Sequence, residues 1–260
     1  MALLHDGITI LNFDRTYIPQ EKLRDYPHEW IDFADLSQTK RYCELDSFKT
    51  IQRRLHLRSR HGITFIGSGN YHYVSYLLLS EIKEPFTCIL FDHHTDMMSE
   101  PSSSLMSCGS WVRRAIRCLP LLNKVIIIGA QPGLLKHIPS DIRPKVVVFP
   151  TGSLDSDGLW IKISQAIETD TVYISIDKDV LDPTQAVTDW DQGTMKLQDL
   201  LNILTHLMTA KKVYGADICG ELPISPLELF HPSSLTAIKK NEYANQKILH
   251  VLKTQHKKIS

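Results

Sequence analysis

The sequence lacks several features that would assign it to a class at once. Basic and acidic residues number 29 each, and no long block of one sign occurs. This balance argues against a nucleic-acid partner and against binding to an anionic membrane surface. No apolar run approaches the roughly 20 residues that a membrane-spanning helix needs, and the segment 1–10 lacks the basic and apolar regions of a signal peptide. We therefore expect a soluble, cytoplasmic protein.

Disulfide, zinc-thiolate and nucleotide-binding signatures are also missing. The five cysteines are an odd number without CxxC spacing, so we expect reduced thiols, with Cys88, Cys118 and Cys219 packed as small hydrophobic side chains. A strand, a Gly-rich turn at 67–70 and a helix follow one another, an order that also fits a phosphate-binding loop. The turn carries neither GxGxxG nor GxxxxGK[ST], so phosphate binding is the weaker interpretation.

Short, continuous apolar runs separated by helical patterns are what the chain does have. Its 260 residues and 43% hydrophobic content allow a sizeable core, and we expect one domain over residues 1–260. Continuous runs are typical of parallel strands that are covered on both faces. The predicted strands are 7–14, 62–67, 86–90, 124–129, 145–150, 171–176 and 212–218. The predicted helices are 73–82, 111–119, 158–168, 196–209 and 241–255, with another opening near residue 46, and 17–46 is expected to be irregular. The alternation predicts an α/β fold.

An acidic motif with a histidine follows the apolar run Phe86–Leu90. If the chain stays extended there, Asp92, His94 and Asp96 project from one face, because side chains alternate along a strand, and His93 points the other way. Three groups able to bind a metal then converge at the end of that strand.

A second acidic pair follows another predicted strand. Asp177 and Asp179 come at the end of 171–176, and His72 lies just past the Gly-rich turn. Parallel strands joined by right-handed crossovers place their carboxyl ends on one edge of the sheet, where ligands of such folds bind. We therefore expect the two motifs to form one site.

The chemistry of this set favours a pair of metal ions. Four carboxylates crowded without counter-charge repel one another, and divalent cations remove that problem. Oxygen-rich ligation with imidazole and without thiolate suits Mn²⁺ better than structural Zn²⁺. Two bridged ions need roughly six protein ligands, and the sequence supplies six: His72, Asp92, His94, Asp96, Asp177 and Asp179.

The same motifs resemble those of the arginase/agmatinase family of ureohydrolases. The family pattern D-A-H-x-D appears at Asp92–Asp96, S-x-D-x-D-x-x-D-P runs from Ser175 to Pro183, and G-G-D-H-S corresponds loosely to Gly67–His72. The resemblance implies a three-layer α/β/α fold around a mostly parallel, about eight-stranded sheet. It also implies a binuclear Mn²⁺ cluster, with two ions per chain, and hydrolysis of a guanidino or amidino C–N bond by a metal-bridging hydroxide. Urea or a related small amide would be released, and a homo-oligomer is common in the family.

Roles for individual residues follow from the resemblance. Asp92 and Asp177 would bridge the ions, with His72 and Asp96 on one and His94 and Asp179 on the other. Asp96 would also orient the hydroxide and pass its proton to the departing amine. Two further catalytic candidates are Cys108, which stands where the family has a proton-shuttling His, and Glu221, which corresponds with a one-residue shift to a Glu that grips the guanidinium.

Substrate choice is where the chain departs from the family pattern. Met98 replaces an Asn with which arginases hold the α-carboxylate of arginine, so arginine itself is a doubtful substrate. The loop Thr188–Thr194 is acidic and contains Trp190, which could enclose a small cationic guanidino or amidino compound by charge and cation–π contact. Helix entry is an equally good interpretation of that loop.

Two other functions stay open at this point. A deacetylase or amidohydrolase on a similar sheet would hold one Zn²⁺ with an Asp-His-Asp set, whereas the presence of both His72 and Asp179 argues for two ions. A metal-binding partner protein without turnover is the other alternative. The missing His at Cys108 and the altered Gly-rich turn are the evidence for it.

Overall fold

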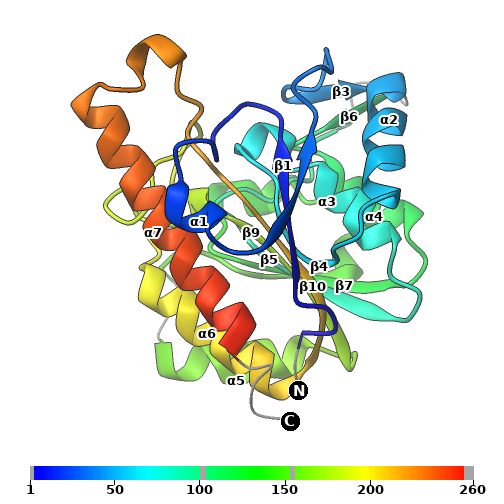
Figure 1. Ribbon diagram of the computed structural model, residues 1–260. Coiled ribbons are helices and arrows are strands. Elements are labelled where there is room, and N and C mark those ends of the chain that lie inside the picture. Colours follow the sequence, from blue (N-terminus) through cyan, green and yellow to red (C-terminus); the bar gives the residue numbers. More distant parts are fainter. Residues whose placement is uncertain (1–2, 100–103, 153–155, 255–260) are drawn as a thin grey trace.

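The centre of the fold is a sheet of eight strands that all run parallel. Figure 1 shows it in the computed structural model, which describes residues 3–99, 104–152 and 156–254. The strand order is β2-β1-β4-β10-β9-β5-β7-β8. The bounds are β1 Gly7–Asn12, β2 His28–Asp32, β4 Gly62–Phe65, β5 Phe86–Phe91, β7 Leu122–Ile128, β8 Val146–Phe149, β9 Thr171–Asp177 and β10 Lys212–Cys219. A separate antiparallel pair joins β3 Tyr42–Glu44 to β6 Leu105–Ser107.

Helices cover both faces of the sheet. They are α1 Glu21–Arg24, α2 Leu45–His56, α3 Val74–Ser80, α4 Trp111–Cys118, α5 Ser156–Ala166, α6 Leu197–Ala210 and α7 Pro232–Thr254. In Figure 1 α1, α5, α6 and α7 lie on one side of the sheet and α2, α3 and α4 on the other. This arrangement confirms the predicted three-layer α/β/α fold with an eight-stranded parallel sheet.

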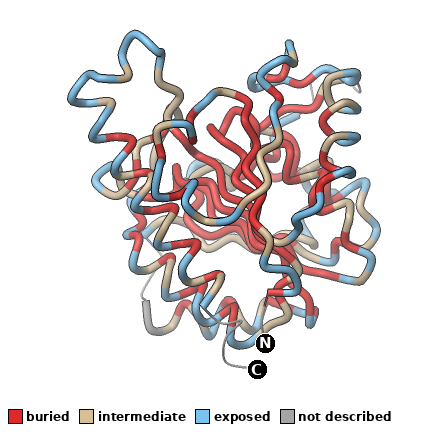
Figure 2. The backbone as a smooth tube through the Cα atoms, in the orientation of Figure 1, coloured by how far each residue is buried: buried red, intermediate tan, exposed pale blue. Residues whose placement is uncertain are grey.

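Two apolar cores follow from the alternation of side chains along each strand. In β5, Ile89 and Phe91 pack with α5, α6 and α7, whereas Cys88 and Leu90 pack with α2, α3 and α4. All six residues of β5 and all seven of β9 are buried, and the central strands are red along their length in Figure 2. Burial on both faces explains why these strands have continuous apolar runs.

Three expectations about local structure need correction. The segment expected to be irregular contains β2, an edge strand that pairs with β1; four of its five residues are half-buried and none is buried, so it lacks the apolar run of a central strand. The last helix begins at Pro232 rather than Asn241. Its first turns carry polar, exposed residues, so the apolar pattern used to predict the helix begins too late. Cys118 is exposed, whereas the other four cysteines are buried.

Among the described residues, no helix is long and apolar enough to cross a membrane.

Candidate metal centre

The site lies where three neighbouring strands end. β9 lies between β10 and β5, with Ile176 opposite Phe91 and Asp177 opposite Cys219. Asp92 therefore emerges beside Asp177 at the carboxyl edge of the sheet. The short helix η1 (Gly69–Tyr71), which follows β4, carries His72 to the same edge, where the His72 N–H donates to the Gly69 carbonyl at 3.1 Å.

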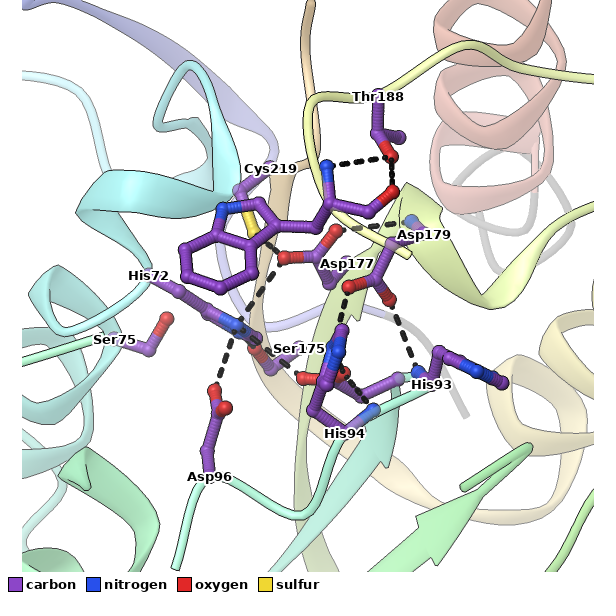
Figure 3. A network of polar contacts seen from close by, with 12 residues as sticks. His72, Ser75, His93, His94, Asp96, Ser175, Asp177, Asp179, Thr188 and Cys219 are labelled. Carbon is purple, nitrogen blue, oxygen red and sulfur yellow. Dashed lines mark hydrogen bonds and ion pairs between the residues drawn. The ribbon is translucent and has the colours of Figure 1, made fainter. Parts of the chain in front are cut away.

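A tight turn, not an extended strand, gathers the first motif. Asp92 Oδ1 accepts the His94 N–H at 2.6 Å, and Asp96 has a positive φ of 50°, a conformation that costs free energy for a residue with a Cβ. Trp111 holds Asp96 in place, because its indole Nε1–H donates to Asp96 Oδ2 at 2.6 Å. The structure brings the three groups together, but the strand alternation used to predict this is wrong after Phe91. His93 points away from the cluster in Figure 3.

His72 faces three carboxylates with one ring nitrogen. Its Nδ1 lies 3.4 Å from Asp92 Oδ2, 3.2 Å from Asp96 Oδ2 and 3.5 Å from Asp177 Oδ2. Figure 3 shows His72 between Asp96 and Asp177. Its Nε2 lies 2.9 Å from the Ser175 hydroxyl.

A buried chain of hydroxyl groups behind His72 determines which nitrogen carries the proton. The Ser175 hydroxyl donates to Asp217 Oδ1 at 2.8 Å, and the Ser75 hydroxyl donates to the same oxygen at 3.0 Å. The Ser175 oxygen must then accept a hydrogen bond from His72 Nε2–H. In the neutral ring this leaves Nδ1 unprotonated, with its lone pair free. Sequence reasoning missed Ser75 and Asp217, although Ser175 opens the second acidic motif.

The second half of the cluster is formed by Asp179 and His94. Asp179 Oδ2 lies 2.8 Å from His94 Nδ1, while Asp179 Oδ1 accepts the His93 N–H at 3.0 Å. His94 Nδ1 is also 3.6 Å from Asp92 Oδ1. Asp92 therefore faces His72 with one oxygen and His94 with the other.

Asp177 is fixed by backbone and thiol donors. Its Oδ1 accepts the Asp179 N–H at 2.9 Å, and its Oδ2 accepts the Cys219 thiol at 3.2 Å. Gly220, with φ of +83°, allows this approach, because a Cβ there would lie 2.4 Å from Asp177 Oδ1. No other residue type fits at position 220 without moving the carboxylate.

The electrostatics of the protein alone reflect this crowding of charge. Burial raises the pKa of Asp92 well above its usual range, and the charges of Asp179 and Asp96 add to the effect. Burial raises the pKa of Asp177 to about 7 in the same way, with Asp179 contributing. Burial opposes the charged form of His72, but Asp96 and the other carboxylates prevail and raise the pKa of His72 to about 10. The group attracts positive charge strongly.

The donor atoms fit divalent cations. Two sets of ligand atoms, each within 4.8 Å of one another, share Asp92: one is His72, Asp92 and Asp96, and the other is Asp92, His94 and Asp179. Asp92 Oδ2 is buried without a hydrogen-bond partner within the described part of the chain. An orphaned carboxylate oxygen beside an imidazole nitrogen, whose lone pair is free once the ring is neutral, is the arrangement that a bound cation would satisfy.

A cavity of about 770 Å³ opens above the cluster. His72, His94, Asp96, Asp177 and Asp179 all line it, whereas Asp92 lies beneath, 1% exposed. The volume is in the range of small-molecule sites.

A sequence model described as the Arginase family matches residues 9–225. The chain belongs to the arginase family. The matched range includes all six candidate ligands.

Relatives of this arginase-family chain extend over almost its whole length. An uncharacterised protein of Thermotoga maritima is 34% identical over 247 residues, which cover 94% of this chain and 89% of that protein. Among solved structures, the proclavaminate amidino hydrolase of Streptomyces clavuligerus has a TM-score of 0.68 at 16% identity, covering 96% of this chain and 93% of that one. The agmatine ureohydrolase of Thermoplasma volcanium has a TM-score of 0.66 at 15% identity, with coverage of 98% and 92%. These structures share the fold of the arginase-family chain.

Glu221 lies inside the protein and not in the cavity wall, where a residue that binds the substrate would have to lie. It is 1% exposed and does not line the cavity. Its Oε1 pairs with the ammonium of Lys178 and accepts from Asn245 Nδ2, and its Oε2 accepts from Gln20 Nε2 at 2.8 Å. Since both oxygens are engaged inside the protein, Glu221 is a structural counter-ion, and the sequence-based role needs correction.

Cys108 does line the cavity, close to the acidic cluster. Burial raises the pKa of its thiol, and the charges of Asp96 and Asp177 raise it further. A thiol in this state gives up its proton poorly, so the protein alone does not prepare Cys108 for proton transfer.

Trp190 lines the cavity as expected, but a cation of the protein itself covers its ring. The guanidinium carbon of Arg41 lies 4.9 Å from the ring centroid. Asp189, from the same loop, accepts a hydrogen bond from Asn70 at 2.6 Å and does not line the cavity. Arg41 therefore occupies a cation–π position on Trp190, and enclosure of a cationic substrate by this loop stays a prediction.

Proposed function

We propose that this arginase-family chain is a hydrolase that uses two Mn²⁺ ions to cleave a C–N bond of a guanidino or amidino compound. The observation that carries the proposal is the shared position of Asp92, which faces His72 with one oxygen and His94 with the other. Two ligand groups joined by one carboxylate are what a bridged pair of ions requires.

The ligands divide between the two positions. His72 and Asp96 would hold one ion, and His94 and Asp179 the other, with Asp92 contributing to both. Asp177 faces His72 and would complete the first position, and its expected bridging to the second position stays a prediction. When bound, such a pair supplies Lewis acidity and lowers the pKa of water, which provides hydroxide near neutral pH.

The chain's own residues then orient the reacting groups and move protons. Ser175 and Asp217 hold the His72 ring in its orientation and tautomer. The Trp111 indole fixes one oxygen of Asp96, a carboxylate that lines the cavity. Asp96 would therefore take a proton from the attacking water and deliver it to the nitrogen of the departing amine.

Two alternatives make different predictions for the same protein. A deacetylase-like site with one Zn²⁺ would use an Asp-His-Asp set and leave either His72 or His94 without a metal. A partner protein without turnover would bind both ions but hydrolyse nothing. Cys108 in place of a better proton carrier is the observation that favours this second alternative.

Metal content and product release together test the proposal. The protein purified with Mn²⁺ should hold two ions per chain by elemental analysis and should release urea or ammonia from a member of a guanidine and amidine panel. Asp177→Asn should lower that rate by at least about a hundredfold, more than the usual loss on removing a residue that supports a ligand. The matched control is Asp46→Asn, since the Asp46 side chain is fully exposed on α2. A rate unaffected by Asp177→Asn would sink the mechanism.

A further inference from the structure

Two arginines line the cavity above the acidic cluster, in addition to the candidate ligands. Within the described part of the chain, its acidic lining residues are Asp96, Asp177 and Asp179, all members of the candidate ligand set. Arg41 and Arg113 line the same cavity. Once cations neutralise the ligands, the described cavity wall offers a substrate two guanidinium groups and no free carboxylate.

Arg41 is held in place by contacts that leave the ends of its side chain free. It adopts a left-handed backbone conformation with φ of 64°. Its N–H donates to the Asn70 carbonyl at 3.1 Å, and its carbonyl accepts the Cys108 N–H at 3.0 Å. Its side-chain Nε donates to Asn70 Oδ1 at 3.2 Å, and the guanidinium lies over Trp190.

These contacts orient the Arg41 guanidinium without satisfying it. Among the described residues, no hydrogen-bond or ion-pair partner occupies its two terminal nitrogens. Stacking on an aromatic ring and one hydrogen bond through Nε already restrict the rotamers of Arg41. The side chain therefore loses less conformational entropy on binding a ligand than a freely exposed Arg would. Arg41 is therefore ready to bind an anion through its outer edge.

Arg113 contributes the second positive charge from α4. One terminal nitrogen, Nη1, donates to the Ser99 hydroxyl at 3.2 Å. Its Nε is buried without a hydrogen-bond partner in the described residues. A carboxylate that entered the cavity would give this guanidinium a charged hydrogen-bond acceptor. The neutral Ser99 hydroxyl is a weaker acceptor.

We propose that the substrate carries a carboxylate at the end opposite to its guanidino or amidino group, and that Arg41 and Arg113 bind this carboxylate. The proposal rests on the proposed hydrolysis at the acidic cluster and specifies its substrate class. A planar guanidinium matches a carboxylate by two parallel hydrogen bonds. A compound with a second amine at that end meets repulsion from both arginines, so a diamine derivative is disfavoured.

Three compounds with the same four-carbon chain test this preference: 4-guanidinobutanoate, butylguanidine and (4-aminobutyl)guanidine. The Mn²⁺-loaded wild type should prefer the acid over butylguanidine by at least about tenfold in kcat/KM, the factor expected for one charge-assisted contact, and should use the amine least. Arg41→Gln and Arg113→Gln should each reduce the ratio of acid to butylguanidine about tenfold or more through KM. Arg41→Lys should fall between them and the wild type.

The control is Arg53→Gln, because Arg53 lies on the exposed side of α2 and contacts Thr50. It should leave all three rates unchanged. Equal use of the acid and the amine by the wild type would overturn the proposal, as would an unchanged ratio in both Arg41→Gln and Arg113→Gln.

Binding of non-hydrolysable ligands separates this proposal from the proposed function. Calorimetry of the Mn²⁺-loaded protein with 4-aminobutanoate and with 1,4-diaminobutane needs no turnover. If the panel is not hydrolysed but the acid binds at least about tenfold tighter and Arg41→Gln removes the difference, the hydrolase proposal fails and the carboxylate subsite stands. If the diamine binds as tightly as the acid, the subsite fails, whatever the activity.

Discussion

Glu221→Gln removes the negative charge that faces Lys178 inside the protein. The two side chains are 2% and 0% exposed, so water does not screen the ammonium that is left behind. Removing one partner of such a pair typically costs about 3–5 kcal/mol. The new amide also turns an N–H₂ group toward the donors of Gln20 or Asn245. We therefore expect the free energy of unfolding to fall by about 3–5 kcal/mol.

Urea unfolding of the variants measures this cost. The matched control is Glu84→Gln, since Glu84 pairs with Lys212 at 2.6 Å where the side chains are 40% and 36% exposed; it should cost less than about 1 kcal/mol. Adding Lys178→Met to Glu221→Gln removes the stranded charge, so the double variant should recover part of the loss.

The opposite result would restore the role suggested by the sequence. If Glu221→Gln unfolds at the same urea concentration as the wild type but raises KM for a guanidino substrate, Glu221 contacts the substrate and its assignment as a counter-ion is wrong.

Three further predictions concern the candidate ligands and the metal. Ser175→Ala should weaken Mn²⁺ binding about 10- to 100-fold in a calorimetric titration, because it removes the acceptor that fixes the histidine tautomer; Ser164→Ala, on the surface of α5, should not, and equal affinities would contradict the tautomer argument. Gly220→Ala should cost at least about 1–2 kcal/mol of stability, because position 220 has a left-handed backbone, and it should weaken Mn²⁺ binding by displacing Asp177. The control Gly133→Ala, with open space around its Cβ, should leave Mn²⁺ binding intact. Unchanged Mn²⁺ affinity in Gly220→Ala would refute the steric argument. Mn²⁺ at a hundred times its Kd should stabilise the fold by about 2.7 kcal/mol, seen as a higher Tm that a chelator reverses, and a Tm indifferent to Mn²⁺ would argue against a site in the folded state.

The sequence predicted the central strands and the ligand motifs for the same physical reason. Strands buried on both faces need apolar residues at every position, so the sudden appearance of Asp92 or Asp177 after such a run marks a strand end. Parallel connections then place those ends on one edge. The edge strand β2 has no such signal, because its residues are half-buried or exposed and its composition is mixed.

The supporting residues could not be found by the same reasoning. Glu221 contacts Gln20, which is 201 positions away in the sequence, and only the packed structure shows that Lys178 closes the same network. Arg41 reaches the cavity through a left-handed backbone conformation after an irregular segment. Local pattern predicts where a metal cluster forms, whereas the residues around it depend on contacts made across the fold.

Anomalous diffraction from crystals grown with Mn²⁺ tests the central claim most directly. The account predicts two peaks about 3.5–4 Å apart, one bound by His72 Nδ1 and Asp96 and the other by His94 Nδ1 and Asp179, with Asp92 bound to both. A single peak, or two peaks that do not share Asp92, would contradict it.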